Sequence, residues 1–146
     1  MTEIQKLRES AEKYASQLGN SYKEVKGYKK QNEEINEEIL KKTNYKNGIQ
    51  KNIDELNKQL DEINQYNLYG GNKIRESILE ARDEFVKFKN KVEQELDDLQ
   101  QEHAKNSDII KELSKQDEKA LRMLNKISEL CEENIEDIKN DNKQYK

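Results

Sequence analysis

The fifteen residues IQKNIDELNKQLDEI, positions 49–63, decide the fold. Their apolar residues recur at alternating steps of four and three, at Ile49, Ile53, Leu56, Leu60 and Ile63. Every other residue in the stretch is polar. This 3.5-residue period is that of a helix whose apolar stripe packs against another helix in a left-handed coiled coil.

The same phase runs through the whole first half of the chain, from Ile4 to Asn67. Of its nineteen seam positions, fourteen are apolar. Asn32 falls on the seam, where a single Asn can specify register, although it can also be a plain polar interruption. Asn47-Gly48 is a turn signal, but the phase is unchanged on both sides of it. We therefore predict one helix over residues 2–66.

The strongest punctuation lies at the chain midpoint, in Asn67-Leu68-Tyr69-Gly70-Gly71-Asn72. Glycine and asparagine tolerate the left-handed backbone that ends a helix, so we predict a turn over 67–72 with Gly70 and Gly71 at its centre. Asn72 is then the cap of a second helix over 73–140.

The second half resumes helical spacing, with a predicted seam that begins at Ile74, Ile78, Ala81, Phe85, Phe88, Val92 and Leu96 and continues to Ile138. Two successive steps of four, from Phe88 to Leu96, predict a local 11-residue repeat. Residues 103–108 are the weakest helical stretch, where the helix could bend or break.

Folding back at the midpoint places residue i opposite roughly residue 140 − i, because the two helices of a hairpin run antiparallel. Lys42 and Lys46, two charges inside the first seam, then meet the acidic stretch Glu93–Asp98. We interpret this match as a device that sets register. The alternative is that both are solvated charge runs. The fold predicted for residues 1–146 is a single all-α domain, a long antiparallel helical hairpin.

Composition excludes several classes of function. Charged residues make up 40% of the chain and hydrophobic residues 32%, too few for a thick globular core. The 31 acids and 27 bases are interspersed, so no basic face for nucleic acid is expected. No apolar run approaches the roughly 20 residues of a membrane span, and no signal-peptide stretch begins the chain. Synthesis in the cytoplasm without membrane insertion is expected.

Residues that could carry chemistry are few and scattered. His103 and Cys131 are the only residues of their types, and on one helix their 28-residue separation is about 40 Å. We interpret them as a polar seam residue and a small buried thiol. No Glu-x-x-His pair or phosphate-loop pattern occurs. The sequence therefore predicts no catalytic residue, metal, cofactor or small-molecule substrate.

The second half carries more apolar residues than one seam can use. Those outside the predicted seam are Leu79, Val86, Ile109, Leu121, Met123, Leu130 and Ile135. A second stripe needs a second partner, so we predict self-association into a bundle, a helical protein partner, or both. The predicted partner-binding residues are Tyr66, Tyr69, Leu79, Val86, Leu121 and Leu130.

A helical hairpin with Tyr69-Gly70-Gly71 at its turn resembles the WXG-type proteins of bacterial type VII secretion, whose turn carries Trp-x-Gly. The run from Ile74 through Phe85 and Phe88 into the acidic 93–98 stretch is similar to the small accessory proteins that pair with LXG-type toxins. The family's tail signal, Tyr-x-x-x-Asp/Glu, is absent here. The resemblance implies a helper that binds a signal-bearing partner and is exported with it by a non-Sec route.

These observations together predict a non-enzymatic, helical protein-binding module. Its expected role is that of an accessory or targeting chaperone that pairs with a helical partner or a secreted toxin domain. The alternative is a structural coiled-coil scaffold or strut, which the long heptad and the high charge favour equally.

Overall fold

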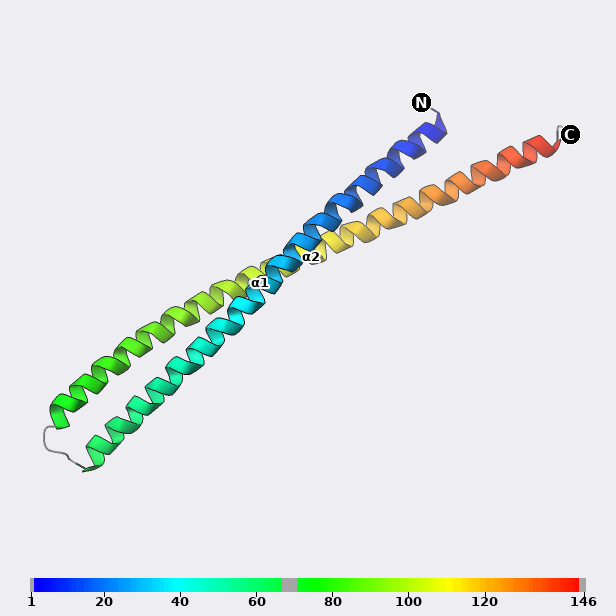
Figure 1. Cartoon of the computed structure of the whole chain (residues 1–146). Coiled ribbons are helices and arrows are strands. Elements are labelled where there is room, and N and C mark those ends of the chain that lie inside the picture. The colour runs from blue at the N-terminus through cyan, green and yellow to red at the C-terminus, as the bar shows by residue number, and fades with distance from the viewer. Residues whose placement is uncertain (1, 67–70, 145–146) are drawn as a thin grey trace. The chain divides into compact units, whose positions relative to one another are not determined.

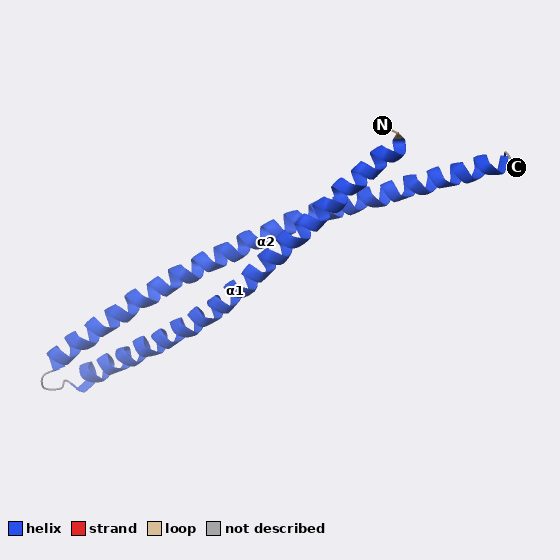
Figure 2. Cartoon of the chain, turned by 45° about the horizontal axis from the view of Figure 1, so that its top comes forward, coloured by secondary structure: helices blue, strands red, loops and turns tan. Residues whose placement is uncertain are grey.

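Two long helices account for nearly all of the chain that the computed structural model describes, residues 2–66 and 71–144. Helix α1 spans Glu3–Tyr66 and helix α2 spans Gly71–Gln144. They run antiparallel and pack side by side (Figure 1), and Figure 2 shows helix as the only regular structure in the described ranges. The chain is an all-α helical hairpin, as predicted.

Helix α1 begins with a capping box. The Thr2 backbone N–H donates to Gln5 Oε1 at 3.0 Å, and the Gln5 backbone N–H donates to Thr2 Oγ1 at 3.2 Å. These reciprocal bonds satisfy two donors that the first turn of a helix leaves without partners.

Neither weak point within the helices interrupts them. Helix α1 continues through Asn47-Gly48, as the unchanged heptad phase predicted. Helix α2 continues through 103–108, so the break considered there does not occur. A glycine costs about 1 kcal/mol in a helix interior, and packing along the seam can outweigh such a cost because helices owe most of their stability to packing.

The predicted turn extends too far toward the C-terminus. Gly71 is the first residue of α2 and Asn72 the second, so neither belongs to a turn and Asn72 is not a cap before Lys73. A Cβ on Gly71 would lie 3.3 Å from Ile63 Cγ2, so glycine here allows α2 to start close to α1. Gly70, with Tyr69, lies outside the described residues. At its other end α2 continues to Gln144, beyond the predicted end at residue 140.

The described residues group into two compact units, each built from parts of both helices. The inner unit is Asn32–Lys105, and the terminal unit combines Met1–Gln31 with Asn106–Lys146. Eight of the ten buried apolar residues belong to the inner unit: Ile35, Ile49, Ile53, Leu60, Ile63, Ile78, Val92 and Leu96. Among the described residues of the terminal unit, only Ala120 and Ile127 are buried and apolar. Burial of apolar surface therefore stabilises the inner unit more strongly.

Polar side chains take several seam positions in the terminal unit. Ser21 and Asn106 are buried, and the Asn106 side-chain N–H donates to Gln31 Oε1 at 3.4 Å. Ser21 Oγ and one carboxylate oxygen of Asp117 are buried without a hydrogen-bond partner in the described chain. Because such burial costs free energy, these residues weaken the packing of this unit further.

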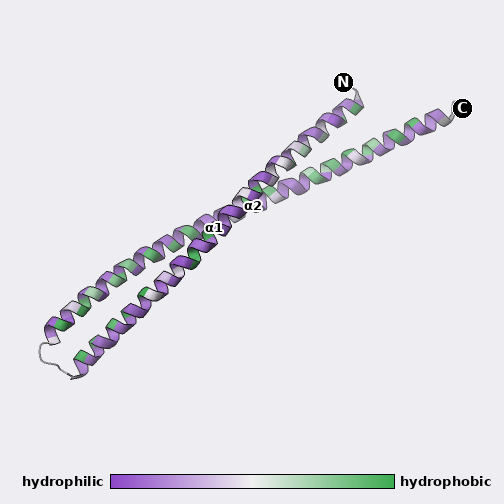
Figure 3. Ribbon diagram, viewed as in Figure 1, coloured by the Kyte–Doolittle hydropathy of each residue, from purple (hydrophilic) through white to green (hydrophobic). Residues whose placement is uncertain are grey.

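The seam of α1 lies where the heptad placed it. Every predicted seam residue from Leu7 to Ile63 is buried or half-buried. Ile4, near the start of the helix, is the exception at 63% exposed. Figure 3 shows hydrophobic residues recurring at intervals along both helices, as expected for stripes on charged helices.

The seam of α2 differs from the prediction between residues 74 and 89. Ile74 and Phe88 are 48% and 51% exposed, while Arg75, Arg82 and Lys89 are half-buried in the seam instead. Counted through Lys89, the spacing from Ile78 to Ile127 alternates between four and three without interruption. The predicted 11-residue repeat at Phe88 is therefore wrong, and the heptad is continuous.

Candidate protein-interaction surface

Lysines of α1 pair with glutamates of α2 in the inner unit. Lys42 Nζ lies 2.6 Å from Glu95 Oε2, and Lys46 Nζ lies 3.3 Å from Glu93 Oε1. These are the pairings expected between the first seam and the acidic stretch of α2. The hydrogen bond to Glu95 raises the pKa of Lys42, and the same bond lowers the pKa of Glu95. Each partner thus favours the charged form of the other.

Asn32 is buried in the same seam. Its side-chain N–H donates to the backbone carbonyl of His103 at 3.5 Å across the two helices. This contact favours the register-setting interpretation of Asn32 over that of a plain interruption. His103 is half-buried at a seam position, as predicted.

Two arginines of α2 reach polar residues of α1 at matched heptad spacing. Arg75 Nη2 donates to Asn64 Oδ1 at 2.5 Å, and Arg82 Nη1 donates to Asn57 Oδ1 at 3.2 Å. Residues seven apart on α2 therefore contact residues seven apart on α1. With this heptad phase of α2, Arg75 and Arg82 take seam positions. Ile74 and Ala81, the apolar residues before them, lie to one side of the seam.

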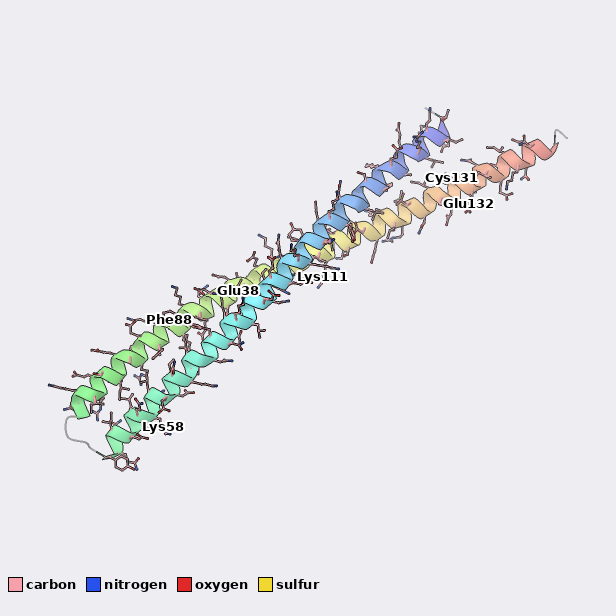
Figure 4. All side chains as sticks on the ribbon, in the orientation of Figure 1. Glu38, Lys58, Phe88, Lys111, Cys131 and Glu132 are labelled. Carbon is pink, nitrogen blue, oxygen red and sulfur yellow. The ribbon has the colours of Figure 1, made fainter. Side chains whose placement is uncertain are left out.

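The displaced residues define one side of the hairpin, here called the aromatic flank: Ile74, Ala81 and Phe88 of α2, with Tyr45 of α1. The rings of Tyr45 and Phe88 lie 6.2 Å apart, tilted by 53°, a separation typical of aromatic pairs. Both remain more than half exposed. Figure 4 shows the labelled Phe88 side chain on α2. The contact joins the two helices but leaves much of both rings open.

Two grooves run along the aromatic flank. The first, about 360 Å³, has the Tyr45–Phe88 pair and Val92 at its centre. Its charged lining consists of Lys41, Lys42, Lys91 and Glu95. The second, about 340 Å³, is lined by Leu56, Lys73, Ile74, Ser77, Ile78 and Ala81. The floor of the first groove is apolar. Its rim is net positive, because Glu95 pairs with Lys42 and two further lysines remain. Apolar grooves on one side of a hairpin suit a helix laid across them.

The structure leaves four of the predicted partner-binding residues exposed. Tyr66 and Leu121 are at least half exposed, and Val86 and Leu130 are each 37% exposed. Exposure is what a contact residue requires, and binding at these positions stays a prediction. Sequence reasoning missed the aromatic flank, since it assigned Ile74, Ala81 and Phe88 to the seam.

Leu79 is half-buried against the cluster of Leu60, Ile63 and Ile78, so it also contributes to the packing of the inner unit, and binding through it stays a prediction. Tyr69 lies outside the described residues, so its prediction has no structural counterpart.

No arrangement suited to metal binding occurs in the described ranges. No group of three or more His, Cys, Asp or Glu residues there could hold a metal ion. Cys131, expected as a small buried thiol, is exposed, because the seam loses its apolar cover toward the end of α2. No helix in the described ranges is long and apolar enough to cross a membrane.

Comparison of the chain with protein-family models, curated proteins and solved structures finds no match.

Proposed function

We propose that this chain is a non-enzymatic helical binding module that lends the uncovered apolar residues of α2 to a helical partner. The observation that carries the proposal is that α2 has more apolar residues than its seam with α1 buries. The two helices already fill one seam, yet Ile74, Phe88 and Leu121 remain about half exposed. Large apolar side chains that a folded chain leaves exposed are candidate contact residues.

The role proposed for the module is that of an accessory or targeting chaperone. Its partner would be a helical protein or the helical domain of a secreted toxin, and the pair would leave the cytoplasm together by a non-Sec route. Support comes from the hairpin architecture, from the resemblance at Tyr69-Gly70-Gly71, and from the exposure of Tyr66 at the end of α1.

A structural strut is the second candidate. The uninterrupted heptad through both helices and the densely charged outer faces favour it. Thermal melts with and without a candidate partner separate the two functions. An accessory protein gains stability when its partner is added, whereas a strut is as stable without it.

The binding proposal is tested with the double variant Val86→Glu/Leu121→Glu. Both residues are exposed, so we expect the variant to stay helical by circular dichroism while co-purification of a host protein falls at least about tenfold. Titration calorimetry with the purified candidate partner then measures the same loss directly.

A matched control is Asn90→Glu/Asn125→Glu, which adds the same two charges at exposed polar positions of α2. It should bind like the unaltered chain. If Val86→Glu/Leu121→Glu loses its helix while every co-purified protein is retained, these residues are core and the interaction proposal is wrong.

A further inference from the structure

The first groove of the aromatic flank is basic as well as aromatic. Lys41 and Lys91 line it beside the Tyr45–Phe88 pair. Within the described residues neither lysine makes a salt bridge, whereas Lys42 forms salt bridges with Glu38 and Glu95. Two lysines without a salt bridge of their own therefore lie beside a half-exposed aromatic floor, and Lys91 also interacts electrostatically with Glu95. An occupant that fits must bring apolar side chains bordered by carboxylates.

Such a segment exists in this chain, near the end of α2. Residues 129–141 carry six acids and one lysine. Within this acidic segment, Cys131, Ile135 and Ile138 follow the i, i+4, i+7 spacing of one helix face, and all three are exposed. Figure 4 labels Cys131 and Glu132 on this part of α2. The segment is an amphipathic acidic helix with an uncovered apolar stripe.

Carboxylates border that stripe on both sides. Glu132 and Glu136 each follow a stripe residue, and Asp137 and Asp141 lie toward the other edge at helical spacing. The acidic segment is thus the electrostatic complement of the first groove, with apolar residues to face the rings and acids to face Lys41 and Lys91.

Length also matches. Ile74 and Phe88 are fourteen residues apart on α2, about 20 Å of helix, and the thirteen residues of the acidic segment span about the same distance. One such helix is long enough to lie along both grooves of the flank. Lys91 of the groove and Glu129 of the acidic segment are 38 residues apart on the one continuous helix α2, so a segment that docks in the groove comes from another copy.

We infer that a second copy of this chain occupies the aromatic flank, with the acidic segment 129–141 of each copy docked in the Tyr45–Phe88 groove of another. The inference rests on the proposed binding function and names its first partner. If two copies exchange segments reciprocally, the assembly closes as a dimer, and otherwise it extends head to tail.

The test uses full-length chains with reversed charges on one site at a time. The groove variant is Lys41→Glu/Lys91→Glu and the segment variant is Glu132→Lys/Glu136→Lys. All four residues are exposed, so both variants should keep the circular dichroism of the unaltered chain. In sedimentation equilibrium over a range of concentrations, we expect each variant to self-associate at least about tenfold more weakly than the unaltered chain.

Mixing the two variants tests directly whether the acidic segment of one chain binds the groove of another. The native acidic segment of the groove variant meets the native groove of the segment variant, and the two reversed sites also complement each other. An equimolar mixture should therefore assemble with the affinity of the unaltered chain. The quadruple variant should recover self-association for the same reason.

A control variant, Lys51→Glu/Lys58→Glu, changes the net charge by the same amount as the groove variant. Its two positions are exposed on α1 and line neither groove. It should associate like the unaltered chain. The inference is overturned if the unaltered chain is monomeric at every concentration, or if mixing the variants restores nothing.

The two proposals fail separately. A monomeric chain that still binds a different protein through Val86 and Leu121 contradicts only the self-docking. A chain that neither associates with itself nor loses any partner in Val86→Glu/Leu121→Glu contradicts the binding function as well.

Discussion

Replacing the exposed glycines of α1 by alanine should stabilise the protein. Gly27 lies in the terminal unit and Gly48 in the inner unit, and both are within one continuous helix. A Cβ built on either one meets no atom within 4 Å. Alanine therefore removes the conformational freedom that glycine gives the unfolded chain, and it introduces no clash.

The expected gain is about 1 kcal/mol per site, the difference between glycine and alanine in a helix interior. For a chain of about 150 residues, 1 kcal/mol raises the melting temperature by roughly 2–4 °C. The double variant Gly27→Ala/Gly48→Ala should thus melt about 4–8 °C higher if the units unfold together. If they unfold separately, each substitution raises only the transition of its own unit.

Thermal melts followed by circular dichroism at 222 nm measure the effect, with Gly71→Ala as the comparison. A Cβ there lies 3.3 Å from Ile63 Cγ2, so crowding offsets the gain in helix propensity and no stabilisation is expected. A lower melting temperature for Gly48→Ala would refute the reasoning, because it would mean that Asn47-Gly48 needs a backbone conformation that alanine cannot adopt.

Three further predictions concern the inner unit. Lys42→Glu and Glu95→Lys should each lower the melting temperature, and the double exchange should recover part of the loss. A double-mutant cycle without coupling would contradict a register role for the pair. Since the folded protein lowers the pKa of Glu95 below its ordinary value of 4.5, the stability from this group is complete above that pH and is lost as pH falls through the folded pKa. Acid titration of the melting temperature should therefore be shallower in Glu95→Gln than in the unaltered chain. Ile53→Ala should cost about 2–5 kcal/mol in urea unfolding because Ile53 is in the core, whereas Phe88→Ala should cost markedly less because half of that side chain is already in water.

The sequence alone determined the fold class, the seam of α1 and the register. Periodicity was sufficient because α1 repeats one phase from Leu7 to Ile63 with polar residues almost everywhere else. Register followed from Lys42 and Lys46, since charges inside an apolar seam need partners at one height of the opposite helix. The observed pairings join residues whose numbers sum to 135–139, close to the expected 140.

Only the tertiary structure decided the phase of α2 between residues 71 and 89, and with it the aromatic flank. Sequence reading takes the most apolar residue of each turn, which favours Ile74 and Phe88 over the basic residues that follow them. The packed hairpin instead keeps Ile78, Phe85 and Val92 in layers seven residues apart, which places Arg75 in the seam. From that position the guanidinium of Arg75 reaches Asn64 of the other helix. That contact depends on a residue of the other helix, which no local pattern contains.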